Sequence, residues 1–208
     1  MNRRRENAET LAAKNPDRCR TISLDVTRPE AWKAAIAEIV AAHQRLDVLV
    51  NNAGIHDDAL LAQIKMGIMA RRAGREFGGV FHSCQAVMQV MISQRNGRII
   101  NLASLSALLA PPGQTNFAAA KAGVLALTQS LAKEVARIGI TVNAVCPGYL
   151  DTEALAGLDD DAKKRALAQI PMRRFGRPEE VAAAFRFLAC AGAGYITGST
   201  LKIDGGII

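Results

Sequence analysis

The sequence predicts an α/β fold with a parallel β-sheet whose strands are connected by helices. Short apolar runs bounded by turn residues alternate along the chain with longer segments of helical period, which is the pattern of strands joined by crossover helices. The runs are apolar almost throughout, so both faces of the sheet should be covered. With 208 residues, half of them hydrophobic, the chain is expected to form a single domain over residues 1–208.

Ten segments are assigned from this pattern. Strands are predicted at residues 20–25, 46–50, 97–102, 140–146 and 199–203. Helices are predicted at residues 29–43, 80–94, 117–138, 160–169 and 178–190. Pro29 and Pro178 suit the first turn of a helix, where a missing amide proton costs nothing, and Gly139 suits a helix stop.

Composition limits the function classes. No run of about 18 apolar residues is present, and the first residues lead into a polar stretch, so we expect a cytoplasmic protein with no membrane partner. The cysteines and histidines lack metal-ligand spacing, so we expect reduced thiols and no metal. A net charge of +7 suits anionic partners such as a phosphorylated cofactor or an acidic carrier protein. With 4% aromatic residues and no basic stripe, no nucleic-acid partner is expected.

The first candidate site is the segment Asn51-Asn52-Ala53-Gly54, which directly follows a predicted strand. Ligands of open α/β sheets bind beyond the carboxyl ends of the strands, where small and amide side chains let a ligand come close. Taken alone, the same four residues would also suit a tight turn. The segments that follow decide between these interpretations.

Three further segments complete a pattern. Residues 101–104, Asn-Leu-Ala-Ser, end the next strand, and residues 116–123, Asn-Phe-Ala-Ala-Ala-Lys-Ala-Gly, open a long helix. Residues 143–148, Asn-Ala-Val-Cys-Pro-Gly, end another strand. In order and spacing, these segments resemble the NNAG, catalytic serine, YxxxK and N-x-x-x-P-G motifs of the short-chain dehydrogenase/reductase family. Residues 113–114 and 139–143 look most like the 3-oxoacyl-acyl-carrier-protein reductases of that family.

The resemblance implies a Rossmann-type, doubly wound parallel sheet. It also implies hydride transfer from NADP(H), with NAD(H) as the other possible cofactor, to a carbonyl group. The implied reaction reduces a 3-oxoacyl thioester linked to acyl carrier protein, in fatty acid biosynthesis, and the implied assembly is a homo-oligomer, a tetramer.

The implied catalytic residues are Ser104, Lys121 and Phe117. Carbonyl reduction needs a proton donor, a second hydrogen bond to the oxygen, and a cation that orients the cofactor. By motif position, Ser104 polarises the carbonyl and Lys121 holds the nicotinamide ribose, the alternatives being an ordinary turn hydroxyl and a solvated helix face. Phe117 stands at the tyrosine position but carries no hydroxyl, so it has no proton to give. We therefore expect impaired reduction or, alternatively, an inactive family member that acts as a binding or assembly subunit.

The implied cofactor residues lie in four places along the chain. Arg3 and Arg4 resemble the basic stretch that selects a 2′-phosphate, hence NADPH, although a flexible basic terminus is the alternative. Asp25 would contact the adenine and Thr152 matches a cofactor-contacting threonine. The complete predicted set is Arg3, Arg4, Asp25, Val26, Asn52, Ala53, Gly54, Lys121, Pro147, Gly148 and Thr152.

The beginning of the sequence departs from the family pattern. Family members begin with a strand, a glycine-rich turn and a helix whose amides cradle the pyrophosphate. We expect the fold to lack these parts, to leave the strand at 20–25 without neighbours, and to bind the cofactor poorly. A start encoded upstream and a decayed gene are the two explanations.

A second departure covers residues 66–77, which have the length of the family's segment but little of its pattern. By position, Glu76 stands where the family's proton relay has an asparagine. Codons can be chosen for residues 69–77 so that reading one base later gives Trp-His-Asp-Val-Leu-Ala-Val-Asn-Leu, which resembles the family's sequence there. We hypothesise two compensating frameshifts, which the gene's nucleotide sequence tests.

Overall fold

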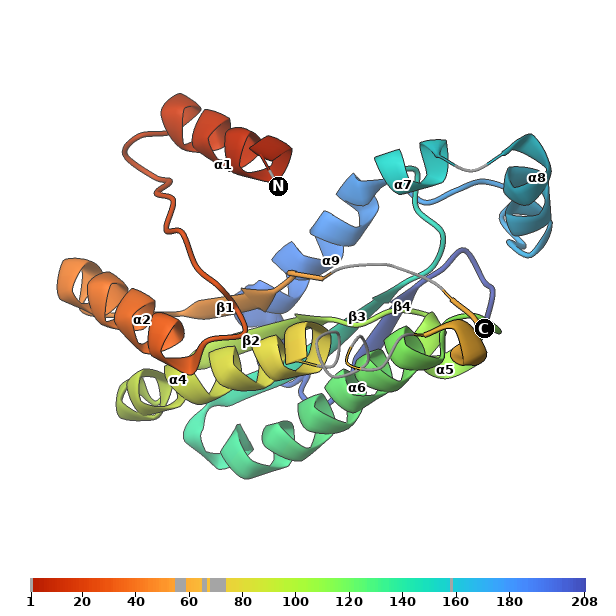
Figure 1. Ribbon diagram of the computed structural model, residues 1–208. Coiled ribbons are helices and arrows are strands. Elements are labelled where there is room, and N and C mark those ends of the chain that lie inside the picture. The colour runs from red at the N-terminus through yellow and green to blue at the C-terminus, as the bar shows by residue number, and fades with distance from the viewer. Residues whose placement is uncertain (1, 55–58, 65–66, 68–73, 158) are drawn as a thin grey trace.

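The computed structural model describes residues 2–54, 59–64, 67, 74–157 and 159–208. Four parallel strands in the order β1-β2-β3-β4 form its centre, with helices on both faces (Figure 1). The predicted α/β class with a Rossmann-type parallel sheet is thereby confirmed. In chain order the elements are α1 Asn2–Lys14, α2 Pro29–His43, β1 Val48–Asn51, η1 Leu61–Gln63, η2 Gly74–Gly78, α4 Gly79–Gln94, β2 Gly97–Leu102, α5 Ser106–Leu109, α6 Thr115–Val135, η3 Ala136–Ile138, β3 Ile140–Pro147, α7 Glu153–Ala156, α8 Asp160–Ala168, α9 Pro178–Ala189, η4 Ala191–Ala193 and β4 Thr200–Ile203.

The strand register brings the candidate motifs to one edge of the sheet. Asn51 of β1 lies opposite Asn101 of β2, and Leu102 lies opposite Val145 of β3. All three pairings between neighbouring strands are parallel, so the carboxyl ends of the strands point the same way. This is the edge at which open α/β sheets bind ligands.

The two faces of the sheet are covered unequally. α4 and α6 lie along one face and α9 along the other (Figure 1). The larger core packs α2, α4 and α6 against β1, β2 and β3, whereas a smaller cluster joins Val181 and Leu188 of α9 to the opposite face. On that second face Val48 and Val50 of β1 remain 39% and 45% exposed. None of the described elements covers them.

Most predicted boundaries agree with the structure. The helix at 29–43 and the strand at 97–102 are confirmed in full, and the other three strands of the sheet begin or end within two residues of their predicted bounds. The long predicted helix comprises α6 and the 3-10 turn η3, and it begins two residues earlier, at Thr115. Gly139 ends it with a left-handed φ of 84°, as expected of a helix stop.

The predicted strand at residues 20–25 is wrong. These residues carry no ladder hydrogen bonds, and Ile22 is 41% exposed. A strand needs a neighbour to receive its amides and carbonyls, and no described strand lies beside this segment. The following residues are fixed instead by the indole of Trp32, whose Nε1 donates to the carbonyl of Val26 at 3.0 Å.

Helix α1 was not predicted. It stands apart from the sheet in Figure 1, and its described side chains are exposed except for the half-buried Ala12, with an ion pair between Arg5 and Glu9 at 2.7 Å. Arg3 and Arg4 lie on this helix, and nothing is described of their side chains. Of the segment 66–77, for which frameshifts are hypothesised, residues 66 and 68–73 lie outside the described residues.

Gly139→Ala should destabilise the fold. A Cβ at this position would lie 2.7 Å from the carbonyl oxygen of Arg95, and the backbone is left-handed. We expect the free energy of unfolding to fall by about 2 kcal/mol, measured by urea denaturation. Gly192→Ala is the matched control, since its Cβ would have its nearest contact at 3.6 Å, and should change stability by less than about 0.5 kcal/mol. Equal stability of the two variants would contradict this interpretation.

Candidate active site

Lys121 is the centre of the site. It lies on α6 with 4% of its surface exposed, and its Nζ donates to the carbonyl oxygen of Leu102, at the end of β2, at 2.8 Å. The same ammonium pairs with Glu76 Oε2 at 3.0 Å. The alternative interpretation, a solvated helix face, is therefore wrong. A buried ammonium persists only when paired and hydrogen-bonded, and both conditions are met.

Phe117 lies one helical turn before Lys121. Its ring centroid is 5.7 Å from the Lys121 Nζ, within the range of a cation–π interaction. The side chain therefore lies beside the buried charge, at the position for which the sequence implied a proton donor. It presents an aromatic ring there and no hydroxyl.

Ser104 follows β2 and is half-buried. Its Oγ donates to Ser106 Oγ at 3.2 Å and accepts from the Ser106 amide at 3.2 Å. The turn at the start of α5 therefore orients the hydroxyl. Lys121 binds the carbonyl of Leu102, and Ser104 follows two residues later in the chain. Both candidate catalytic residues are therefore at the end of β2.

Glu76 reaches the site from η2, a single π-helical turn, and is 1% exposed. Gly54 makes room for its carboxylate, because a Cβ built on Gly54 would lie 2.9 Å from Glu76 Oε2. The end of β1, the turn η2 and helix α6 therefore meet at this carboxylate. Position had indicated Glu76 from the sequence, but its pairing with Lys121 was not predicted.

A buried polar network supports the strand ends. Asn51 Nδ2 donates to Asn101 Oδ1 at 2.9 Å, and Asn101 Nδ2 donates to Thr128 Oγ1 of α6 at 2.9 Å. Ser83 of α4 donates to Asn51 Oδ1 at 2.6 Å. The network ties β1, β2, α4 and α6 together behind the site. Ser83 and Thr128 were missed because nothing distinguishes them in sequence from other hydroxyls on helices.

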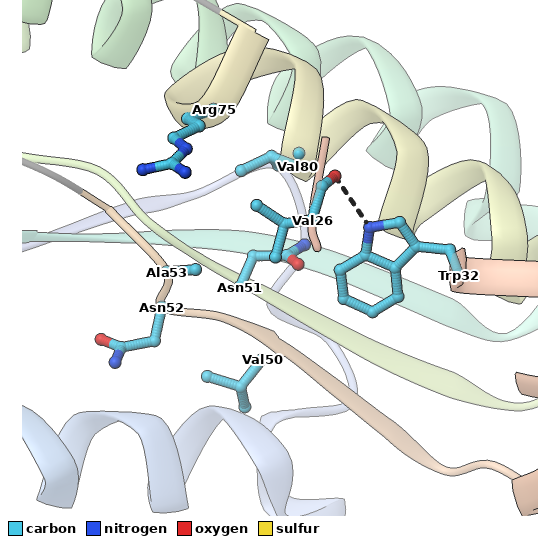
Figure 2. A pocket seen from close by; sticks show the side chains of 9 residues that line it. Val26, Trp32, Val50, Asn51, Asn52, Ala53, Arg75 and Val80 are labelled. Atoms are coloured by element: carbon cyan, nitrogen blue, oxygen red, sulfur yellow. Dashed lines mark hydrogen bonds between the residues drawn. The ribbon is translucent and has the colours of Figure 1, made fainter. Parts of the chain in front are cut away.

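A pocket opens beside the end of β1. Figure 2 shows Trp32 on one side of it and Asn52 and Ala53 on the other, with Arg75 extending over it. The space between these side chains is about 280 Å³, part of it open to solvent. The remaining lining residues are Val26, Val50, Asn51, Gly79 and Val80. Two predicted cofactor segments, at 25–26 and 52–54, therefore meet in space.

Asp25 lies at the edge of this region with its carboxylate already engaged. Its Oδ1 accepts from the amide and the hydroxyl of Thr27 at 3.0 and 2.8 Å. These hydrogen bonds, followed by the positive charges of Arg75 and Arg28, lower the pKa of Asp25 below its ordinary value. The group is therefore a fixed anion at neutral pH.

The remaining predicted residues lie at and beyond the end of β3. The Gly148 amide donates to the carbonyl of Ile203 at 3.0 Å, and a Cβ there would lie 2.9 Å from the Asp204 Cα, so a larger residue would clash with backbone. Pro147 closes the strand, whereas Thr152 precedes α7 and is exposed. Pro147, Gly148 and Thr152 therefore lie at and beyond the end of β3, whereas Asn52, Ala53 and Gly54 follow β1.

The chain is similar in sequence to a known protein family and to several known proteins. The model of the family described as Enoyl-(Acyl carrier protein) reductase matches residues 1–208. Proteins named 3-oxoacyl-acyl-carrier-protein reductase FabG are similar. The one from Thermotoga maritima is 44% identical over 185 residues, which cover 89% of this chain and 75% of that protein. The one from Chlamydia trachomatis is 39% identical over 200 residues, 96% of this chain and 81% of its own length. The chain belongs to the short-chain dehydrogenase/reductase family.

As a short-chain dehydrogenase/reductase, the chain is an oxidoreductase by family. The structure brings Ser104, Phe117 and Lys121 to the carboxyl edge of the sheet. None of the described helices is long and apolar enough to cross a membrane. Within the described ranges, no group of three or more His, Cys, Asp or Glu side chains is placed to hold a metal ion.

Thr128→Val should destabilise this reductase through the buried network. It leaves the amide of Asn101 without its acceptor in a position that is 0% exposed. The expected loss in free energy of unfolding is about 1 to 3 kcal/mol, measured by denaturant titration. Ser130→Ala, on the exposed side of the same helix, is the control and should have little effect. A Thr128→Val variant as stable as this control would rule out a structural role for the network.

Thiol labelling tests the burial of α4. Burial raises the pKa of Cys84 to about 12, so its reactive thiolate is scarce at neutral pH. Cys190 is exposed. Iodoacetamide should therefore modify Cys190 in the native protein and Cys84 only after unfolding, as read by peptide mass spectrometry. Rapid native labelling of Cys84 would show that this packing is wrong.

Proposed function

We propose that this chain uses NADPH to reduce the 3-oxo group of an acyl thioester carried by acyl carrier protein, with impaired activity. The observation that carries the proposal is the buried Lys121, bound to the end of β2 two residues from Ser104 and beside Phe117. The curated relatives named above, 3-oxoacyl-acyl-carrier-protein reductases, support the substrate class.

The residues present fit part of a dinucleotide. The pocket is partly open to solvent and lies beside the end of β1, where open α/β sheets bind ligands, and we propose it for the adenosine part. Its walls are apolar and amide groups, and Arg75 is the one cation among the described residues that line it. We propose that Asp25, Val26, Asn52, Ala53 and Gly54 hold this part. Arg3 and Arg4 are proposed for the 2′-phosphate, and Pro147, Gly148 and Thr152 for the nicotinamide half.

The chain's own groups would act on the carbonyl oxygen and on the ribose. When bound, NADPH supplies the hydride that the carbonyl carbon accepts. Ser104 donates a hydrogen bond to the carbonyl oxygen, exchanging its present partner, Ser106. Lys121 donates to the ribose hydroxyls. The proton that completes the alcohol comes from water, because Phe117 has none to give.

Positive charge supports an acidic carrier as partner. The chain carries +7, and a positive field accelerates encounters with anions. The exposed segment after α8 contains Arg173, Arg174 and Arg177. Arg174 is committed to Glu180 through two contacts of 2.8 and 2.7 Å, and Arg177 pairs with the same carboxylate at 3.8 Å, so Arg173 is the better candidate for contact with the carrier.

Phe117 also favours a second candidate function, a family member without catalysis that binds partners or assembles with an active homologue. Such a chain would bind NADPH without turnover. The two functions make different predictions for a variant that restores the hydroxyl.

Phe117→Tyr should raise the rate of 3-oxoacyl thioester reduction by about 10²- to 10⁴-fold, the usual contribution of a positioned acid. The assay follows NADPH absorbance with a 3-oxoacyl thioester as substrate. Phe187→Tyr, on the exposed side of α9, is the control and should leave the rate unchanged. NADPH binding without any gain in rate for Phe117→Tyr would favour the binding subunit and overturn the reductase.

A further inference from the structure

The pair of Glu76 and Lys121 is a feature that the proposed reaction does not use. Their side chains are 2% and 5% exposed, and the charged atoms are 3.0 Å apart. Moving a carboxylate out of water costs roughly several kcal/mol of desolvation free energy. A well-placed counter-charge and hydrogen bonds can offset this cost. Because the pair is buried, interactions inside the protein fix the position of the Glu76 carboxylate, unlike that of a mobile surface side chain.

The packing of the turn η2 holds Glu76 in place. Gly54 lies against it, with room for no side chain. The neighbouring Phe77 packs on α6 at Gly123, where a Cβ would lie 3.1 Å from the ring. The π-helical turn η2 bridges the two contacts, and such turns frequently occur at functional sites. Glu76 is therefore anchored to both the end of β1 and the helix that carries Lys121.

The partners of the ammonium limit its orientation. A lysine ammonium has three N–H donors. One is directed to the carbonyl of Leu102 at 2.8 Å, and the ammonium nitrogen also lies 3.0 Å from Glu76 Oε2 in an ion pair. Because the Leu102 carbonyl and the Glu76 carboxylate are both fixed, these two contacts limit how the ammonium can be oriented.

We propose that Glu76 is a positioning residue for Lys121. Its carboxylate holds the ammonium at the end of β2 and leaves an N–H of Lys121 for the ribose hydroxyls in the nicotinamide half of NADPH. This inference rests on the proposed function, because it assigns a direction to the lysine that the proposed reaction uses. Glu76 itself does not touch the reacting atoms.

The test compares two ligands in the full chain. Glu76→Gln keeps the size of the side chain and removes its charge. It should weaken NADPH binding about tenfold, equivalent to about 1.4 kcal/mol, measured by nicotinamide fluorescence. Adenosine 2′,5′-bisphosphate lacks the nicotinamide half, so its affinity, measured by calorimetry, should not change. Glu38→Gln, an exposed glutamate on α2, is the matched control and should bind both ligands as the parent chain does.

Each result separates the possibilities. Unchanged affinity for both ligands, or an equal loss for both, would overturn the positioning role. A parent chain that binds no NADPH at all would overturn the proposed function instead, and the inference with it.

Should Glu76→Gln fail to fold, the parent chain provides the measurement. A held ammonium exchanges its protons slowly, so ¹⁵N spectra of labelled lysine should show one persistent Nζ signal, assigned to Lys121 by through-bond correlation. Loss of that signal to fast exchange would show that the ammonium is not fixed, and would overturn the proposal.

Discussion

A charged group inside a protein must be compensated, and this constraint governs the site around Lys121. The ammonium is 4% exposed, so it needs acceptors and a counter-charge at short range. The end of β2 provides the acceptor through Leu102, and Glu76 provides the charge. For both to reach one nitrogen, the ends of β1 and β2, the turn η2 and the start of α6 must converge. The convergence that satisfies Lys121 also places Phe117 beside it, and Ser104 follows two residues after the Leu102 that binds it.

The sheet makes this convergence possible. Parallel strands place their carboxyl ends together, and the Asn51, Asn101 and Thr128 hydrogen bonds fix β1 and β2 against α6 from behind. Helices α2, α4 and α6 pack on one face of the sheet, whereas Val48 and Val50 remain exposed on the other. The ammonium of Lys121 therefore lies in a buried environment. Phe117 fits such an environment well, since an aromatic ring packs beside the ammonium, but the proton that reduction requires is missing from that position.

Much of the fold follows from local sequence, and the exceptions have physical causes. The apolar pattern of β2 and the proline-led pattern of α2 are strong enough to be predicted in full. Residues 20–25 have the composition of a strand, yet a strand exists only beside a partner, and a local pattern carries no information about one. Motif spacing brought Ser104, Phe117 and Lys121 into the predicted site. The partner of Lys121 was not predictable, because residues 66–77 lack the pattern from which a pairing would be inferred, and a contact between distant segments depends on how they pack.

The most direct measurement of this constraint is a double-mutant cycle on the unfolding free energy, with Glu76→Leu, Lys121→Met and the combined variant. Each single change leaves one buried charge without its partner and should cost about 3 to 5 kcal/mol. The combined variant removes both charges, so its loss should be smaller than the sum of the two by at least about 2 kcal/mol. Additive losses within about 0.5 kcal/mol would contradict a buried ion pair at the centre of this site.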